Sequence, residues 1–445
     1  MSDSTSHLPA RPSLVQLRKR AKERLSALRV EKPRATLADA QYDLAREYGF
    51  ESWPKLVHHV ESVRPSERLQ QFEQLADDVL VGYRGDQPAL RRLIGHFGSN
   101  HDPDQIRKQV QKHVDDARGV SPDTATLAEV RLMVARQYDF ESWAELQVAN
   151  SAEREPNRDS TRNPMPAPPF YRIDTRKNTI EPRPPLTSTD WDAIFAIMKE
   201  RGITGIRTAA VTDDVMARLA RLDFVTEVGL GGAQGLTDDG LLRLSEMPQL
   251  ERLDLSGWHS PVTDRGLEVL RHLPSLRGFS LEWAQRVTDA GVANLSSCEH
   301  LEEVDLMGTP TGDGALRALG GKSQLGKLGT GKLVTDNGLL LLHDMPGFET
   351  WRGERIEYDL MSFGAGTGGL LLDGSFTDRG LASLEGLDGL ASLQLFWHSR
   401  NFTSEGIAAL ANVANLGYLG CQGELCDDAA MRSIATLPNL RMLMA

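Results

Sequence analysis

Leucines recur along the second half of the chain in a Leu-x-x-Leu-x-Leu pattern, and one unit, residues 250–275, shows what each position predicts. Leu253 and Leu255 alternate with polar residues, which predicts a short strand with its leucines on one face. Thr263 and Asp264 predict a helix start, because a side-chain oxygen can accept from free backbone N–H groups and the helix dipole favours the carboxylate. Pro274 predicts the end of that helix. One unit cannot bury its own leucines, so the units must stack.

The motif Thr-Asp-x-Gly-(Leu/Val) marks the clearest units, which begin at Thr237, Thr263, Thr288, Thr335 and Thr377. Weaker copies begin at Thr212, Thr311, Thr403 and Cys426, and the usual step is 23 to 26 residues. This period is typical of a leucine-rich-repeat solenoid, an α/β fold with parallel strands on the concave face and helices on the convex face. We expect such a solenoid over residues 187–445, with a helix through Trp191 to Glu200 as its N-terminal cap.

The repeats resemble cysteine-containing leucine-rich repeats, the type found in F-box-associated proteins and in bacterial relatives. The cysteine of that subclass occurs at Cys298, and Met247, Leu273 and Met345 take its apolar place in other units. No F-box is recognisable upstream, so the resemblance implies no ubiquitin-ligase role.

One step in the series is too long, since Thr335 and Thr377 are 42 residues apart. The excess predicts an insertion near residues 351–375, which is a loop, a hairpin or a decayed repeat. Insertions in solenoids usually project from one face and often touch partners. A surface insertion without a role is the simpler interpretation.

Residues 1–150 contain an internal duplication, because residues 36–56 and 126–146 share 11 of 21 positions at a constant offset of 90. In each copy a threonine predicts a helix start, and a Tyr-x-Phe-Glu-Ser-Trp run predicts a break followed by a second helix. The aromatic residues most simply hold the corner between the two helices. This all-α module resembles one found before ankyrin and leucine-rich repeats in bacterial proteins, which implies a bacterial origin and an interaction role.

Residues 151–186 carry eight prolines among many polar residues, which predicts a linker between the two halves. Binding of its proline-rich stretches to another protein is the alternative, and a spacer is the simpler interpretation.

Charge is unevenly distributed along the chain. Residues 1–202 carry 31 Lys and Arg against 30 Asp and Glu, so the net charge of −12 belongs to the repeat half. Several of these acids fall at predicted helix starts, and a solvated acidic surface is the simpler interpretation. The alternative is a surface that binds a basic protein partner. No nucleic-acid partner is expected, because binding to a phosphate backbone needs clustered Lys and Arg.

Sequence features also bear on the compartment. No stretch resembles a signal peptide or reaches the length of an apolar membrane span, so no membrane association is expected. Three sparse cysteines suit a reducing environment better than a disulfide framework. These features predict a cytoplasmic protein.

Motifs for chemistry are incomplete. Residues 364–369 satisfy Gly-x-Gly-x-x-Gly, but the residues that follow predict a strand or turn where a dinucleotide site needs a helix. Lys322 ends a P-loop-like run in which Leu316 replaces the first glycine. Cys421 and Cys426 have the wrong spacing for a zinc site. We therefore predict no catalytic residue, no cofactor and no metal site.

Strand positions that alternate with the leucines predict an outward array on the concave face. Trp283 and Trp397 fall beside this array, whereas Trp258, at a strand exit, more simply fills the solenoid core. Charged and aromatic side chains on a preformed concave surface favour protein recognition. The predicted partner-binding residues are Arg252, Asp254, Glu282, Trp283, Glu303, Asp305, Phe396, Trp397, His398 and Tyr418.

Three functions stay open at this point. The first is a non-enzymatic scaffold that binds a protein partner on the concave face. The second is an acidic inhibitor or regulator of a basic enzyme. The third is an enzyme that uses the 351–375 insertion as an active-site loop.

The chain stops at residues 437–445, inside the Leu-x-x-Leu start of a further unit. Solenoids normally end in a polar capping repeat, so we expect either a fragment of a longer repeat protein or an end covered by another chain or element. An uncovered terminal strand also invites pairing, which predicts self-association or fraying over residues 416–445.

Overall fold

The computed structural model describes residues 14–62, 67–97, 103–118, 125–138, 140–150, 170–350, 369–396, 398–421 and 427–444. The chain forms two compact units, one from Met1–Gln74 with Phe140–Ala167 and one from Leu75–Asp139 with Pro168–Ala445. None of the helices in these described ranges is both long and apolar enough to cross a membrane. The helices before residue 150 are α1 (Leu14–Glu31), α2 (Leu37–Glu47), α3 (Trp53–Ser62), α4 (Glu67–Tyr83), α5 (Gln87–Phe97), α6 (Pro103–Arg118), α7 (Leu127–Gln137) and α8 (Trp143–Ala149).

The duplicated segments start and stop their helices at equivalent residues, as predicted. Thr36 and Thr126 each form a capping box with the acidic residue three positions later. In the first copy Tyr48 is buried in a cluster with residues of α1, α2 and α3, and Phe50 and Trp53 pack against that cluster. The aromatic residues of this copy therefore hold the corner between α2 and α3.

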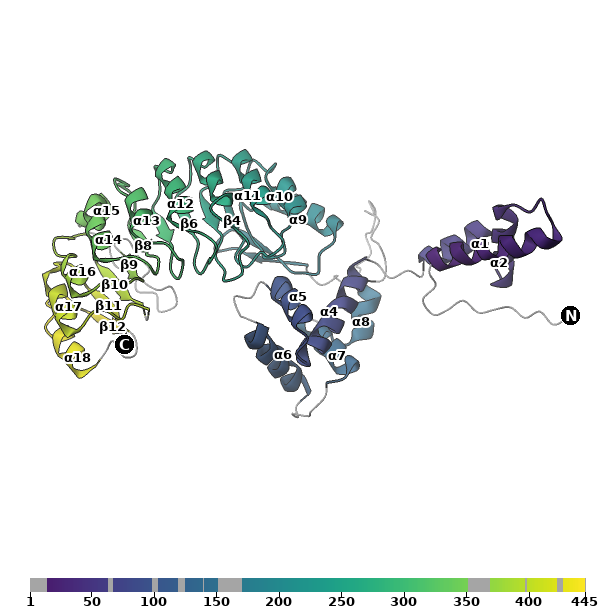
Figure 1. The fold of residues 1–445 in the computed structure, drawn as a ribbon, viewed down its shortest axis with the longest axis horizontal. Helices are drawn as coiled ribbons and strands as arrows, with labels where there is room; N and C mark the ends of the chain where they lie inside the picture. Colours follow the sequence, from purple (N-terminus) through teal and green to yellow (C-terminus); the bar gives the residue numbers. More distant parts are fainter. Residues whose placement is uncertain are drawn as a thin grey trace. The chain divides into compact units, whose positions relative to one another are not determined.

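In the described part of the chain, twelve strands form one sheet in chain order. The pair β1 and β2 is antiparallel, and the strands from β2 to β12 are parallel. Figure 1 shows these strands along the inner side of an arc and the helices α10 to α18 along its outer side. The strands are β1 (Tyr171–Asp174), β2 (Thr179–Pro182), β3 (Gly205–Arg207), β4 (Glu227–Gly229), β5 (Arg252–Asp254), β6 (Gly278–Ser280), β7 (Glu303–Asp305), β8 (Lys327–Gly329), β9 (Gly369–Leu372), β10 (Ser392–Leu395), β11 (Tyr418–Cys421) and β12 (Met442–Met444). This architecture is a leucine-rich-repeat solenoid, as predicted.

Short helices return the chain from one strand to the next. A capping helix, α9 (Ser188–Arg201), precedes them and buries Trp191, Ile194 and Met198 in the core of the solenoid, as predicted. The others are α10 (Asp213–Leu219), α11 (Asp238–Leu241), α12 (Asp289–Val292), α13 (Asp313–Ala318), α14 (Asp336–Leu340), α15 (Pro346–Glu349), α16 (Asp378–Ala382), α17 (Ser404–Ala409) and α18 (Asp428–Ile434), with 3-10 turns at Leu242–Glu246, Gly266–His272, Ala293–Ser297, Leu341–Asp344 and Leu410–Asn412.

The central residue of each parallel strand points into a continuous core. Leu253, Phe279 and Val304 are in register across β5, β6 and β7 and are almost fully buried. Cys298 is also buried, as are the residues that take its place in other units. The leucine pattern of the sequence therefore identifies this core correctly.

Part of the stretch predicted as a linker is a β-hairpin. Strands β1 and β2 lie within residues 151–186, and Ile180 of β2 is fully buried in the solenoid core. Prolines and charged residues interrupt the alternation of apolar and polar residues in these two short strands, so the sequence pattern did not predict them. Residues 151–169 lie outside the described residues, and the boundaries of the two halves stay predictions.

The long step from Thr335 to Thr377 places no extra strand between β8 and β9, because these two strands pair directly. Residues 351–368 lie outside the described residues. The end of the predicted insertion, Gly369–Leu372, is β9 itself, so these residues belong to the sheet. The choice between a loop, a hairpin and a decayed repeat stays a prediction. The glycine-rich run at 364–369 leads into this strand and not into a helix.

The Thr-Asp-x-Gly motif joins consecutive repeats by hydrogen bonds. The carboxylate of Asp238 accepts from the backbone N–H of Thr263 at 2.9 Å and from its hydroxyl at 2.6 Å. Asp264 accepts in the same way from Thr288 in the next repeat. The other pairs are Asp213 with Thr237, Asp313 with Thr335, Asp336 with Thr377 and Asp378 with Thr403. We call this series the aspartate ladder, and it continues across the overlong step.

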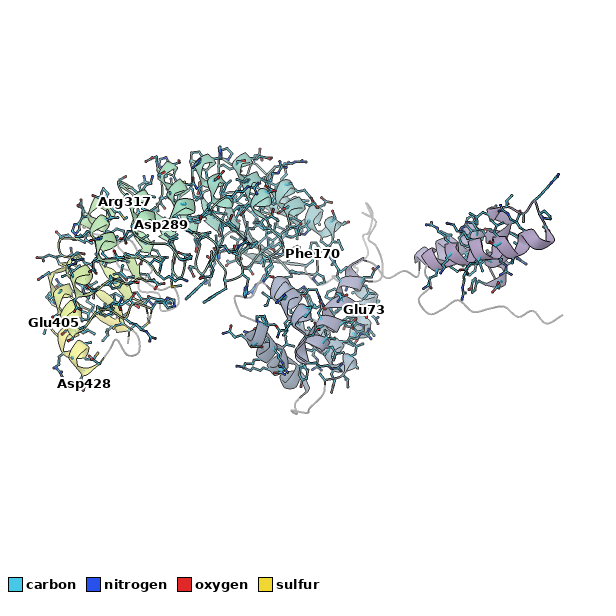
Figure 2. All side chains as sticks on the ribbon, viewed as in Figure 1. Glu73, Phe170, Asp289, Arg317, Glu405 and Asp428 are labelled. Atoms are coloured by element: carbon cyan, nitrogen blue, oxygen red, sulfur yellow. The ribbon has the colours of Figure 1, made fainter. Side chains whose placement is uncertain are left out.

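The motif contains glycine because a side chain at this position would collide with the aspartate of the preceding repeat. A Cβ on Gly266 would lie 2.5 Å from Oδ1 of Asp238, and a Cβ on Gly291 would lie 2.4 Å from Oδ1 of Asp264. The ladder varies at Asp289, labelled in Figure 2, which accepts from the N–H of Gly312 at 2.6 Å where the threonine is absent. The prediction that these aspartates act on their own helix starts is therefore incomplete, because they bond the following repeat.

Candidate binding site on the concave face

Two rows of side chains cover the concave face, because strand residues alternate between the core and this surface. One row runs through Glu227, Arg252, Gly278, Glu303 and Lys327 on β4 to β8. The other row runs through Arg207, Gly229, Asp254, Ser280, Asp305, Gly329, Leu371 and Gln394 on β3 to β10. Glycines in both rows leave space between the charged side chains.

This space forms a hollow of about 430 Å³ over the strands β3 to β9. Its charged lining consists of three basic residues, Arg207, Arg252 and Lys327, and five acidic residues, Glu227, Asp254, Glu282, Glu303 and Asp305. Met307 and Leu371 supply an apolar part of its wall. We call this space the concave hollow.

The three basic side chains of the hollow pair with only two of its carboxylates. Arg207 donates from Nε to Glu227 at 3.0 Å. Lys327 donates to Glu303, and Arg252 Nη1 lies 3.5 Å from the other oxygen of the same carboxylate. Within the described part of the chain, Asp254, Glu282 and Asp305 form no ion pair with a basic side chain.

Glu282 and Asp305 hydrogen-bond to each other and so share the negative charge of one small region. Burial, and then repulsion from Asp305 and Asp254, raise the pKa of Glu282 to about 8, although Lys327 opposes this shift. Burial also raises the pKa of Asp305, although the backbone N–H of Met307 donates to it at 3.0 Å. The pair therefore holds a proton at neutral pH.

Aromatic side chains border the hollow at the carboxyl ends of the strands. Trp258 stacks on Trp283 with ring centres 5.0 Å apart and planes 11° apart. Phe396 and His398 each lie 5.8 Å from the Trp283 ring, centre to centre. We call these four residues the aromatic cluster. It adjoins the hollow because Met307 and Leu371, which line the hollow, pack with Trp283 and Phe396.

The backbone holds Trp283 in an unusual conformation. Its φ of 63° lies in the left-handed region, which bulky residues rarely adopt. Its N–H donates to Met307 O at 2.8 Å, and the Gln285 amide donates to the carbonyls of Trp283 and Gly308. The indole lies against Gly308, where a Cβ would come within 2.4 Å of the ring. Such strain is common where a side chain is fixed for a function.

A buried carboxylate fixes the other side of the cluster. Asp373 has no exposed surface, accepts from Gly308 N–H at 3.0 Å and lies 3.1 Å from Nδ1 of His398. Burial raises the pKa of Asp373, and the hydrogen bond with His398 opposes that shift. Asp373 thus connects the glycine beneath Trp283 to the histidine at its edge.

The structure brings most of the predicted residues together. The concave hollow contains Arg252, Asp254, Glu282, Glu303 and Asp305, and the aromatic cluster contains Trp283, Phe396 and His398. Tyr418 is mostly buried on β11, and its hydroxyl lies 3.6 Å from the sulfur of Met444, so it belongs to neither group. Trp397 lies outside the described residues.

The prediction for Trp258 is wrong. Its side chain is 46% exposed and stacks on Trp283 instead of filling the core. The turn after β5 contains Gly257 at a φ of 140°, which lets the chain direct Trp258 outward.

Several residues of the site escaped the sequence analysis. Glu227 and Lys327 occupy the same strand position as Arg252 and Glu303. Arg207 occupies the same strand position as Asp254 and Asp305. Extending the repeat register through every strand would have found them. Asp373 fell inside the predicted insertion and carried no motif.

Other candidate chemistry has structural explanations. Lys322 of the P-loop-like run is 4% exposed and donates to Ser296 O at 2.8 Å, which connects two repeats. Burial raises the pKa of the Cys298 thiol to about 11, so this thiol is a poor nucleophile. In the described ranges, no three His, Cys, Asp or Glu side chains are grouped as metal ligands.

No protein-family model and no curated protein matches this chain. Among solved structures, it is similar to an internalin (inlF) from Listeria monocytogenes, at 19% identity and a TM-score of 0.38 over 56% of this chain and 69% of the other. It is also similar to a chain of the yeast Rad7 and Elc1 complex, at 18% identity and a TM-score of 0.29 over 58% and 83% of the two chains. The plant peptide hormone receptor RGFR1, solved with RGF2, gives 14% identity and a TM-score of 0.29 over 56% and 41%.

Proposed function

We propose that this protein is a non-enzymatic scaffold that binds a protein partner on the concave face of its solenoid. The observation that carries the proposal is the concave hollow with the exposed Trp258 and the fixed Trp283 beside it. Tryptophan and arginine are among the side chains that contribute most to the binding energy of protein interfaces. A surface that is held in place before binding also loses little entropy when a partner binds.

The aspartate ladder favours this function over an acidic inhibitor of a basic enzyme. An inhibitor that mimics an anionic surface needs exposed, unsatisfied carboxylates. Part of the acidity of the repeat half is instead committed to hydrogen bonds between repeats, for example at Asp238 and Asp264.

Affinity capture from a lysate of the native organism tests the proposal. The wild-type chain is compared with Trp258→Ala and with Leu340→Ala, a matched control because Leu340 is a similarly exposed apolar residue on α14. We expect the partner to be lost with Trp258→Ala and kept with Leu340→Ala. Equal recovery with both variants would exclude the concave face as the binding surface.

A further inference from the structure

The concave hollow has an imbalance that defines what can bind there. Its basic side chains are used by Glu227 and Glu303, which leaves Asp254, Glu282 and Asp305 without a cation in the described part of the chain. Carboxylates crowded in this way repel one another, and a positively charged group between them removes the repulsion. The ligand complementary to this part of the hollow is therefore a cation.

The positions of the two carboxylates on neighbouring strands indicate the type of cation. Asp305 is the last residue of β7, and Glu282 lies two residues after the end of β6. They therefore extend from neighbouring strands, which lie about 4.8 Å apart in a sheet. A guanidinium presents parallel N–H donors in a fixed plane and can bond two carboxylates at once, whereas an ammonium is a point charge. Met307 and Leu371 supply an apolar wall for the methylene groups of an arginine.

A second observation, at Gln394, points to a peptide. Gln394 follows Leu371 in the same row on the next strand, and Leu371 lines the hollow. Its side chain is 1% exposed, and among the described residues neither its amide nitrogen nor its amide oxygen has a hydrogen-bond partner. An unpaired buried amide costs roughly 1–3 kcal/mol. A peptide backbone offers both a donor and an acceptor and would remove this cost.

We propose that the concave hollow binds an arginine side chain of an extended peptide segment, with Glu282 and Asp305 as its carboxylate partners and Gln394 as a partner of the adjoining peptide backbone. This inference rests on the proposed function and specifies the chemistry of the partner. The bound guanidinium replaces the proton that the two carboxylates share, so binding at neutral pH releases a proton.

The charged groups that face Glu282 determine the size of this effect. They are Asp254 and Arg252 on β5, Asp305 and Glu303 on β7, and Lys327 on β8. Lys327 and Arg252 are held by Glu303, so they compensate Glu282 only in part. Arginine keeps its charge across the accessible pH range. Affinity is therefore expected to rise with pH up to about 8, by up to roughly tenfold per unit, and to level off above it.

Calorimetry with a defined probe tests the inference. The probe is acetyl-Ala-Ala-Arg-Ala-Ala-amide, and the reference is the same peptide with citrulline, which keeps the shape and removes the charge. Titration of the full chain in buffers of different ionisation enthalpy measures the protons released. We expect tighter binding of the arginine peptide and release of close to one proton at pH 7.

Three variants separate binding from folding. Glu282→Gln should abolish proton release on binding. It should also lower the affinity for the arginine peptide more than the affinity for the citrulline peptide. Glu251→Gln, at an exposed carboxylate beside β5 that does not line the hollow, should change neither. Gln394→Met should raise the thermal stability of the protein, because an unpaired amide is removed. The same variant should lower the affinity for the arginine peptide.

The outcomes that overturn the inference are distinct from those that overturn the proposed function. Equal affinity for the two peptides, or no binding of the arginine peptide, would exclude an arginine site. If the partner is nevertheless lost with Trp258→Ala, the proposed scaffold function still stands. Binding of Ca²⁺ with the same proton release, in competition with the peptide, would assign the hollow to an inorganic cation.

Discussion

Carboxylates of the solenoid occupy two regions with opposite environments. On the helix side, Asp238 and its counterparts in the aspartate ladder accept hydrogen bonds from the next repeat. On the concave face, Glu282 and Asp305 lie beside each other without a basic partner in the described part of the chain. The same charged group therefore stabilises the fold in one region and remains available for a ligand in the other.

The pKa values of one carboxylate from each region, Asp336 and Glu282, move in opposite directions. At Asp336 burial raises the pKa, but hydrogen bonds from Thr377 and the charge of Arg379 outweigh burial and leave the pKa below its usual value. At Glu282 burial and neighbouring acids both raise the pKa, to about 8. Net charge, which counts both carboxylates equally, does not distinguish them.

Breaking the aspartate ladder should have the largest effect on stability. Gly266→Ala places a Cβ against Asp238, and we expect a loss of about 1–3 kcal/mol in the free energy of unfolding. Asp238→Ala should cost a similar amount, about 1–3 kcal/mol, because it leaves the Thr263 N–H without its partner. Urea unfolding followed by circular dichroism measures both.

A double variant and a neighbour provide the controls for this prediction. In Asp238→Ala/Gly266→Ala the clash is absent, so the combined loss should be smaller than the sum of the two single losses. Asp239→Ala removes an exposed ion pair with Arg265 and should cost less than about 1 kcal/mol. Additive losses would contradict the contact between Asp238 and Gly266.

The opposite pKa shifts predict opposite responses to pH. The raised pKa of Glu282 contributes stability that is complete below its unfolded value of 4.5 and is lost as the pH rises through about 8. The lowered pKa of Asp336 contributes stability that is present above its unfolded value of 3.8 and is lost as the pH falls below it. Melting temperatures between pH 3 and 9 should therefore show Glu282→Gln flattening the alkaline decline and Asp336→Asn flattening the acidic one. Parallel curves for both variants and the wild type would refute this contrast.

Variants of the two stacked tryptophans should differ in their effects on partner binding and on the free energy of unfolding. Trp258 is 46% exposed, so Trp258→Ala should change the free energy of unfolding by less than about 1 kcal/mol while it weakens partner binding. Trp283→Ala should cost more stability, because Trp283 contacts Gly308, Phe396 and His398. Thermal denaturation of the two variants measures the difference. An equal loss of stability would show that Trp258 also supports the fold.

The smallest expected effect concerns the protection of backbone amides from hydrogen exchange along the solenoid. Among the described residues, strand β12 pairs with β11 alone and its residues are half-buried, whereas β5 to β7 have neighbours on both sides. We expect amide hydrogen exchange to be faster over residues 427–444 than over residues 250–306. Equal protection in a sample that sediments as a monomer would contradict both this expectation and the predicted self-association.

The sequence by itself determined the solenoid, because the repeat is encoded locally. Leu253 and Leu255 alternate within one unit, Thr263 caps the helix region that follows, and a period of 23 to 26 residues requires the units to stack. The same register placed Arg252, Asp254, Glu303 and Asp305 on one face. The hairpin β1–β2 was missed because two short strands with prolines and charges leave little alternation to detect.

Only the tertiary structure decided what these residues do. The partner of Asp238 is Thr263 in the following repeat, and the pKa of Glu282 depends on Asp305, which stacking brings beside it. Trp258 and Trp283 are 25 positions apart in the sequence and meet only because consecutive strands are in register. Local spacing fixes which face a side chain occupies. Its charge state and its hydrogen bonds depend on neighbours about one repeat away, which only the stacked repeats bring together.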